Sequence, residues 1–304
     1  MDLKSRKQIL NNWQLYLMLL LPLLFLIIFV YLPMFGVVIA FKNYRPLKGI
    51  WGSEWVGFKH FVCFFKSYQF KRVLWNTIKI SLYSLVAGFP IPIIFALSLN
   101  YIKNKHYKKT IQTVVYAPYF ISTVVIVSMI TQFFTPRRGF LAVLLTSIVG
   151  HSVDIIPVPE FFDDLYVWSG VWQSVGFNSV IYIACLSGVN PELHEAAIVD
   201  GATKFIRIFK IDLPHIIPTA IVLLILNLGR VLNVGYEKVF LMQNPLNLSH
   251  SEIISTYVYK VGLESNIPQY SYSAAIGLFQ SVVGLILITV VNKIANKVGD
   301  KGIW

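Results

Sequence analysis

The feature that most constrains this chain is a series of long runs without a charged side chain. These runs cover residues 8–41, 80–102, 110–136, 165–191 and 265–292, and a shorter one covers residues 213–229. A helix rises about 1.5 Å per residue, so about 20 apolar residues cross a bilayer core about 30 Å thick. Because backbone amides inside a membrane must be paired within the segment, each run is expected to be helical. The sequence predicts an all-α integral membrane protein with six transmembrane helices.

We treat the chain as a single transmembrane domain over residues 1–304. The spans are predicted at about 13–41, 76–102, 111–135, 165–190, 214–236 and 270–292. The composition fits a protein embedded in lipid. Of its residues 56% are hydrophobic and 13% are charged, whereas about 25% are charged in soluble proteins. The apolar segment 139–153 is too short to cross the bilayer, so it is predicted to be an interfacial or re-entrant helix.

Basic residues determine the expected orientation. The net charge of +12 suits anionic lipid headgroups, because the basic residues cluster beside the apolar runs. With the N-terminus inside, the inner segments and the outer loops each hold 13 basic residues, but the inner segments are about half as long in total. Short loops obey the positive-inside rule most closely. The charge density therefore favours N- and C-termini in the cytoplasm.

The chain shows no sign of an enzyme or of a metal site. It has no G-x-x-x-x-G-K-[ST] loop for binding nucleotide phosphates, and its six histidines and two cysteines are scattered without a metal-ligand spacing. We expect no metal and no cofactor on this chain. Any energy from ATP must then come from another subunit.

Residues 190–214 are predicted to form two short helices at the membrane surface. Asn190 can cap the first helix, and Pro191 suits its first turn. Gly201 can adopt the left-handed backbone that ends this helix. Pro214 is expected to end the second helix just before the fifth span begins.

The composition of this segment would fit any connector at the membrane surface, but its residues follow a more specific pattern. Glu-Ala-Ala at 195–197 is followed by Asp-Gly at 200–201 and by Ile-Asp-Leu-Pro at 211–214. This pattern, over about 24 positions, closely resembles the EAA loop of binding-protein-dependent ABC transporter permeases. The resemblance implies that the loop is cytoplasmic and docks as a coupling helix on an ATP-hydrolysing subunit. The residues expected to make or support that contact are Glu195, Ala196, Ala197, Asp200, Gly201, Phe205, Leu213 and Pro214.

The resemblance extends over most of the chain. The stretches that carry it lie at 116–120, 172–173, 233–240, 257–262, 272–284 and 298–304. They look like the carbohydrate branch of the family, and specifically like permeases for pectin and alginate fragments. The resemblance implies a type I importer in the bacterial cell membrane. Its other parts are a second permease, two ATPase subunits that bind ATP and Mg, and an extracellular lipid-anchored solute-binding protein.

Polar residues of the fourth and fifth spans are candidates for the solute pathway. If the fifth span continues as a helix past Arg230, then Asn227, Arg230 and Glu237 lie near one face. An intramembrane arginine faces a partner or a wet cavity, and its planar guanidinium pairs well with a carboxylate, so Arg230 suits an acidic sugar. The alternative is an ion pair with Glu237, or snorkelling to headgroups.

Resemblance to permeases for maltose places sugar contacts on the same two spans. It points to positions around Ser174 and Phe177 in the fourth span and around Arg230 in the fifth. Aromatic rings stack on sugars, and amides bond their hydroxyl groups. The residues expected to line the pathway are Trp172, Ser174, Phe177, Asn178, Asn227, Gly229, Arg230, Asn233 and Glu237.

The interpretation that follows is a permease subunit that moves oligosaccharides, including uronate-containing ones, inward by alternating access. One alternative keeps the importer class and changes the cargo to a small solute that is not a sugar. A second alternative, an ion-coupled secondary transporter, would show inverted repeats and acids at the midplane of the membrane. Neither feature is visible in the sequence.

Overall fold

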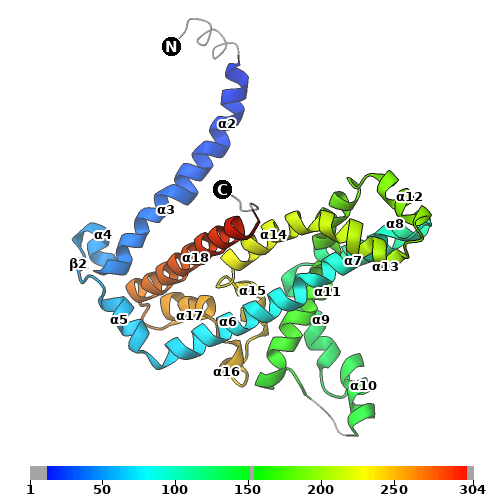
Figure 1. The fold of residues 1–304 in the computed structure, drawn as a ribbon. Helices are drawn as coiled ribbons and strands as arrows, with labels where there is room; N and C mark the ends of the chain where they lie inside the picture. The colour runs from blue at the N-terminus through cyan, green and yellow to red at the C-terminus, as the bar shows by residue number, and fades with distance from the viewer. Residues whose placement is uncertain (1–11, 151–153, 300–304) are drawn as a thin grey trace, which may run out of the picture. The chain divides into compact units, whose positions relative to one another are not determined.

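The computed structural model describes residues 12–150 and 154–299, and the chain divides into two compact units (Figure 1). Unit 1 comprises Met1–Lys66 and Val258–Phe279, and unit 2 comprises Ser67–Tyr257 and Gln280–Trp304. The terminal segments predicted to be cytoplasmic lie partly outside the described residues, as do the last three residues of the segment 139–153.

Four helices in the described part of the chain are long and apolar enough to cross a membrane. They are Trp13–Phe41, Tyr68–Asn100, Lys204–Gly229 and Tyr270–Lys297. Lys105–Phe120 and Thr123–Phe134 meet at 99°, and they make a fifth span if they are counted as one. The predicted span 111–135 is therefore bent in the structure and consists of two helices. The fourth predicted span is a helix of 28 residues, Pro159–Leu186, but polar side chains along it lower its hydropathy.

Unit 1 begins with the helix 13–41, which is continuous through a π-helical turn, Ile27–Tyr31, and a 3-10 end, Phe35–Phe41. Its other elements are α2 (Trp13–Leu26), α3 (Leu32–Met34), β1 (Lys42–Asn43), α4 (Gly49–Gly52), β2 (Glu54–Trp55) and α5 (Lys59–Lys66). β1 and β2 pair antiparallel, with Lys42 opposite Trp55. This short hairpin brings the Phe41 and Trp55 rings into a stack 5.7 Å between centroids.

Unit 1 also receives the segment after Tyr257. This segment holds the end of α17 (Ile254–Tyr259), a π-helical turn (Lys260–Glu264) and the start of α18 (Tyr270–Gly299). The backbone amide of Tyr44 donates to Ser271 Oγ at 2.9 Å, and the buried Phe64 ring packs on Phe279. These contacts join two segments that are more than 200 residues apart in sequence.

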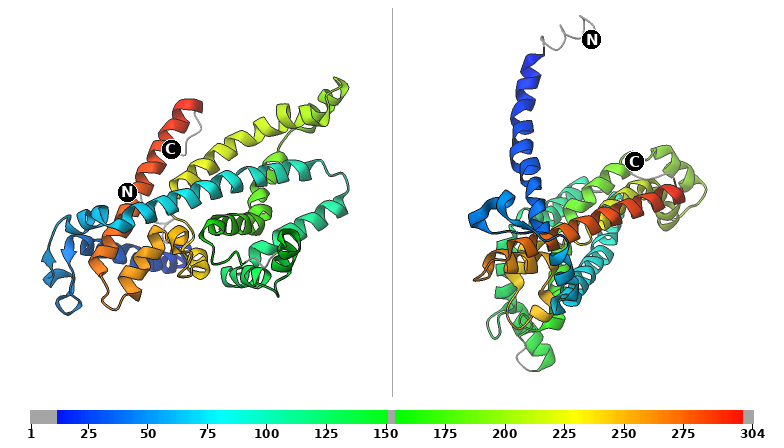
Figure 2. Two further views of the ribbon diagram at one scale, coloured as in Figure 1. Left: turned by 90° about the horizontal axis from the view of Figure 1, so that it is seen from below. Right: turned by 90° about the vertical axis from the view of Figure 1, so that its left-hand side faces the viewer.

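Unit 2 is built around α11 (Pro159–Leu186), which contacts α6, α7, α8, α14 and α16. Its other helices are α6 (Tyr68–Gly88), α7 (Pro90–Asn100), α8 (Lys105–Tyr116), α9 (Thr123–Phe134), α10 (Phe140–Val149), α12 (Pro191–Val199), α13 (Lys204–Arg207), α14 (Leu213–Gly229), α15 (Tyr236–Met242) and α16 (Leu248–Ser251), together with the C-terminal part of α18. Helices α7 and α14 extend together toward the end of the unit that carries α12 and α13 (Figure 1, Figure 2).

Two apolar clusters hold α11 at its two ends. One packs Phe162 of α11 against Ile80 of α6, Val127 of α9 and Val239 of α15. The other packs residues 182 and 186 of α11 against α7 and α14, where Ile216 is fully buried. Between these clusters α11 carries polar side chains, among them Gln173, Ser174 and Asn178.

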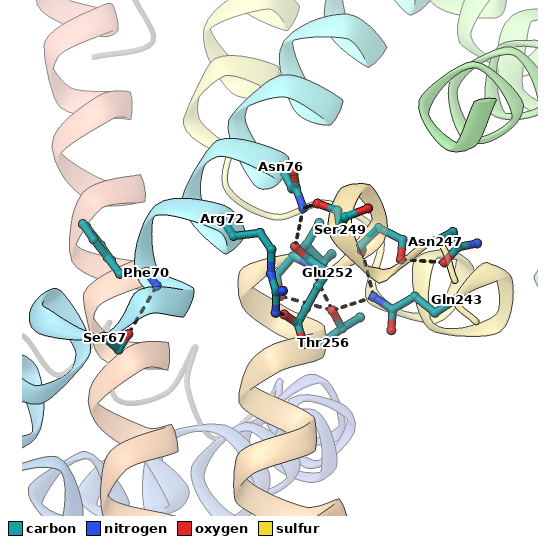
Figure 3. A network of polar contacts seen from close by, with 11 residues as sticks. Ser67, Phe70, Arg72, Asn76, Gln243, Asn247, Ser249, Glu252 and Thr256 are labelled. Carbon is teal, nitrogen blue, oxygen red and sulfur yellow. Dashed lines mark hydrogen bonds and ion pairs between the residues drawn. The ribbon is translucent and has the colours of Figure 1, made fainter. Parts of the chain in front are cut away.

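A polar network fixes the segment after α15 to α6 (Figure 3). Arg72 of α6 forms an ion pair with the buried Glu252. The side-chain amide of Asn76 donates to the backbone carbonyls of Ser249 at 2.9 Å and Glu252 at 3.0 Å. Buried polar atoms that are paired in this way specify one arrangement of the loop, because any other arrangement would leave them unsatisfied.

Candidate functional site

A cavity of about 640 Å³ opens in unit 2 along the middle of α11. Its wall comes from α6, α7, α11, α14, α15 and the residues between α14 and α15. The polar side chains of the wall are Ser81, Ser84, Gln173, Ser174, Asn178, Asn227, Arg230, Asn233 and Lys238, and the aromatic ones are Phe89, Tyr166, Phe177 and Tyr182. Hydroxyls, amides and rings of this kind suit a polyhydroxylated ligand. Two cations and no carboxylate lie among these residues.

The cavity brings together six of the nine residues predicted for the pathway. They are Ser174, Phe177, Asn178, Asn227, Arg230 and Asn233. The other three do not line it: Trp172 lines a separate apolar groove between α9, α10 and α11, Gly229 packs on α18, and Glu237 is exposed on α15. Their predicted contact with the solute remains a prediction.

The fifth span ends earlier than expected. α14 stops at Gly229 with Arg230 as its C-cap, so the prediction of one helical face from Asn227 to Glu237 is wrong. A Cβ at Gly229 would lie 2.8 Å from Ile288, which shows how closely α14 and α18 approach. Among the described residues, Arg230 and Glu237 form no ion pair.

The turn after α14 is held in place from two sides. The side-chain amide of Gln280 on α18 donates to the carbonyl of Leu232 at 2.6 Å and to Asn233 Oδ1 at 2.9 Å. On the other side the backbone amide of Gly235 donates to the Tyr166 hydroxyl at 3.2 Å. These contacts arise more than 40 residues away in sequence, so periodicity within residues 214–236 could not reveal them.

Lys238 is a cavity residue that the sequence analysis missed. Only 9% of it is exposed, and its ammonium donates to the carbonyl oxygen of Tyr166 at 2.8 Å. The same ammonium lies 4.8 Å from the centre of the Tyr166 ring, in cation–π contact. The sequence shows a lysine eight residues after Arg230, but the pattern of residues in α15 does not predict that its side chain lines the cavity.

The bend between α8 and α9 is attached to α11 beside the cavity. The Tyr119 and Phe177 rings stack at 3.9 Å between centroids, and the Gln173 amide donates to the carbonyl of Ile121 at 3.0 Å. A Cβ at Gly176 would lie 2.3 Å from the carbonyl oxygen of Val115, so only glycine permits this approach of α8 to α11. One face of Phe177 is therefore covered by Tyr119.

The segment 190–214 folds locally much as the sequence predicts. Asn190 caps α12 by accepting from the backbone amide of Glu192, and Pro191 lies in the first turn. Gly201 adopts φ +75°, the left-handed region, after the helix. Thr203 then caps α13 by accepting from the amide of Ile206.

The prediction that Pro214 separates this segment from the fifth span is wrong. Helix 204–229 is continuous from α13 through a π-helical turn, Ile208–Asp212, into α14. Pro214 lies in the first turn of α14, directly after the π turn.

The surface of α12 and α13 is unusually apolar for a connecting segment. The exposed apolar side chains there are Leu193, Ile198, Val199, Phe205, Ile206 and Phe209, with Val199 88% and Phe205 74% exposed. Among the residues predicted for coupling, Glu195, Ala196, Asp200, Gly201, Phe205 and Pro214 are exposed, and Ala197 and Leu213 are half-buried. Several large apolar side chains exposed on one short segment are typical of a protein-interaction surface.

A buried carboxylate connects α12 to two spanning helices. Asp212 is fully buried, accepts a hydrogen bond from the Tyr101 hydroxyl at 2.6 Å, and lies 3.2 Å from His194 Nε2. The Arg207 guanidinium lies 5.5 Å from the centre of the Tyr101 ring. We call these four residues the Asp212 cluster. It joins α12, the end of α7 and the start of α14 at one point.

Residues 88–300 match the family described as "Binding-protein-dependent transport system inner membrane component". The chain belongs to this family. The permease is thus an integral membrane component of a transport system, and the all-α membrane fold predicted from its sequence is confirmed.

Close relatives cover nearly the whole permease. Protein LplB of Bacillus subtilis (strain 168) is 44% identical over 294 residues, which make up 97% of this chain and 92% of LplB. The polygalacturonan/rhamnogalacturonan transport system permease protein YteP of the same strain is 40% identical, over 95% of this chain and 90% of YteP. A crystal structure of a bacterial ABC transporter involved in the import of the acidic polysaccharide alginate contains a chain that matches with TM-score 0.88 and 38% identity, over 97% of this chain and 99% of that one.

Proposed function

We propose that the permease moves oligosaccharides, including uronate-containing ones, inward across the bacterial cell membrane by alternating access. The observation that carries the proposal is the cavity along α11, whose wall combines amides, hydroxyls, aromatic rings and two cations without a carboxylate. Its similarity to permeases of polygalacturonan and alginate transport systems supports an acidic carbohydrate as the cargo.

The energy for transport comes from separate subunits in this proposal. Two ATPase subunits bind ATP and Mg, and the exposed apolar patch on α12 and α13 docks on one of them. The permease pairs with a second permease subunit, and an extracellular lipid-anchored binding protein delivers the oligosaccharide. Both termini and the segment 190–214 face the cytoplasm, so that the patch reaches the ATPase.

The Asp212 cluster supports the coupling role of this segment. A helix that docks on an ATPase drives transport only if its displacement is transmitted to the spanning helices. The cluster joins α12 to α7 and α14, and both helices line the cavity farther along. ATP-driven displacement of α12 therefore changes the cavity wall.

Reconstitution of the complete complex into proteoliposomes tests the proposal. ATP-dependent accumulation of an oligogalacturonide, delivered by the binding protein, is the expected result. Accumulation driven by an ion gradient without ATP, or ATP-driven uptake of a small solute in place of any oligosaccharide, would refute it.

A further inference from the structure

The more buried of the two cavity cations, Lys238, has no counter-ion in the part of the chain that the structure describes. No carboxylate there lies within ion-pairing distance of its ammonium. Asp163 pairs with Lys79, Asp164 accepts from the Tyr83 hydroxyl, and Glu237 is exposed on α15. None of these three acids lines the cavity.

A buried charge without a counter-ion is costly, and an anion entering the cavity would offset that cost. Burial lowers the pKa of Lys238 to about 8, so its ammonium is still mostly protonated at neutral pH. The other titratable groups that line the cavity are Tyr166 and Tyr182 on α11 and Arg230 after α14. Both cations are thus available to an anionic ligand.

The position of the Lys238 ammonium is fixed by its surroundings. Its contact with the Tyr166 carbonyl uses one of the three ammonium donors and leaves two for a ligand. A Cβ at Gly170 would lie 3.3 Å from the ammonium nitrogen, so the glycine gives the ammonium its space. The exposed Arg230 lines the same cavity from the end of α14.

We propose that Lys238 and Arg230 form a paired-cation site that binds carboxylate groups of an acidic sugar, and that Lys238 sets the preference for acidic over neutral oligosaccharides. This proposal rests on the proposed function and adds to it the residue that selects the cargo. Arg230 offers two parallel donors to a carboxylate, while Lys238 acts as a point charge. Neighbouring amides of Asn178 and Asn227 bond the sugar hydroxyls.

The test compares wild type with Lys238→Gln and Lys238→Arg in the complete complex. Binding of trigalacturonate and of a neutral galactose trisaccharide to the detergent-purified complex is measured by calorimetry, and ATP-driven uptake of both is measured in proteoliposomes. Loss of a charge-assisted contact predicts that Lys238→Gln lowers the acidic-to-neutral ratio by about 10- to 100-fold. Lys238→Arg, which keeps the charge, is expected to restore most of the ratio.

Lys71→Gln serves as the matched control, because Lys71 is exposed on α6 and lies outside the cavity. An equal loss for both trisaccharides in Lys238→Gln, or an unchanged ratio, overturns the proposal. Competition by inorganic phosphate as strong as that by galacturonate overturns the assignment to carboxylates. Failure of the wild-type complex to take up either trisaccharide refutes the proposed function itself, which separates the two outcomes.

Discussion

The Asp212 cluster gives a quantitative prediction about coupling. In Asp212→Asn the side chain keeps its shape and can still accept from the Tyr101 hydroxyl, but it loses its charge. A hydrogen bond to a carboxylate contributes about 1.5–3 kcal/mol, against about 1 kcal/mol for a bond to a neutral amide oxygen. We expect a net loss of about 0.5–2 kcal/mol in the contact between α12 and the spanning helices. That loss changes the ratio of joined to separated states by about 2- to 30-fold.

The assay measures oligosaccharide accumulated per ATP hydrolysed in proteoliposomes, together with the thermal unfolding of the complex. We expect Asp212→Asn to keep ATP hydrolysis while the transport-to-hydrolysis ratio falls severalfold, because α12 then moves without carrying α7 and α14. Asp154→Asn, which changes an exposed carboxylate before α11, is the control. A variant of Asp212 with the wild-type ratio and stability would refute the reasoning. A fall in the ratio with Asp154→Asn would show that the effect is not specific.

Three further predictions follow from individual residues. Gly201→Val places a β-branched side chain at φ +75°, and the strained backbone costs about 1–2 kcal/mol. We expect this variant to reduce the ATPase activity that the binding protein stimulates, measured as phosphate release. Gly176→Ala drives a Cβ to within 2.3 Å of the Val115 carbonyl oxygen and should lower the unfolding temperature of the complex, whereas Gly277→Ala, whose added Cβ meets no atom within 4 Å, should not. Because the pKa of Lys238 is about 8, its charge is lost as the pH rises, so uptake of an acidic relative to a neutral oligosaccharide should fall between pH 7 and 9; a constant ratio would contradict this.

The sequence predicted well those features that short stretches of chain determine. The cap at Asn190 and the left-handed Gly201 depend on neighbouring residues alone, and both are confirmed. Long apolar runs likewise became continuous helices at 13–41 and 270–297, because their backbone pairing is internal.

The features that the sequence analysis did not predict depend mostly on contacts between distant segments. The end of α14 at Gly229 is accompanied by close packing on Ile288 and by the bond from Gln280, which no local pattern contains. The bend of 99° had a local signal that could have been read: Ser122 caps the next helix, and the chain is extended at Ile121 just before it. The ammonium of Lys238 lies beside Gly170 and donates to the carbonyl of Tyr166, both on another helix, so no pattern within α15 could place it in the cavity.

The first helix, 13–41, has a consequence for how such a protein is assembled. Its helical segments α2, Ile27–Tyr31 and α3 are apolar and none of their residues is buried. Lipid can therefore cover them on every side. A span of this kind needs no contact with another helix to remain inserted in the bilayer, because its backbone pairing is internal.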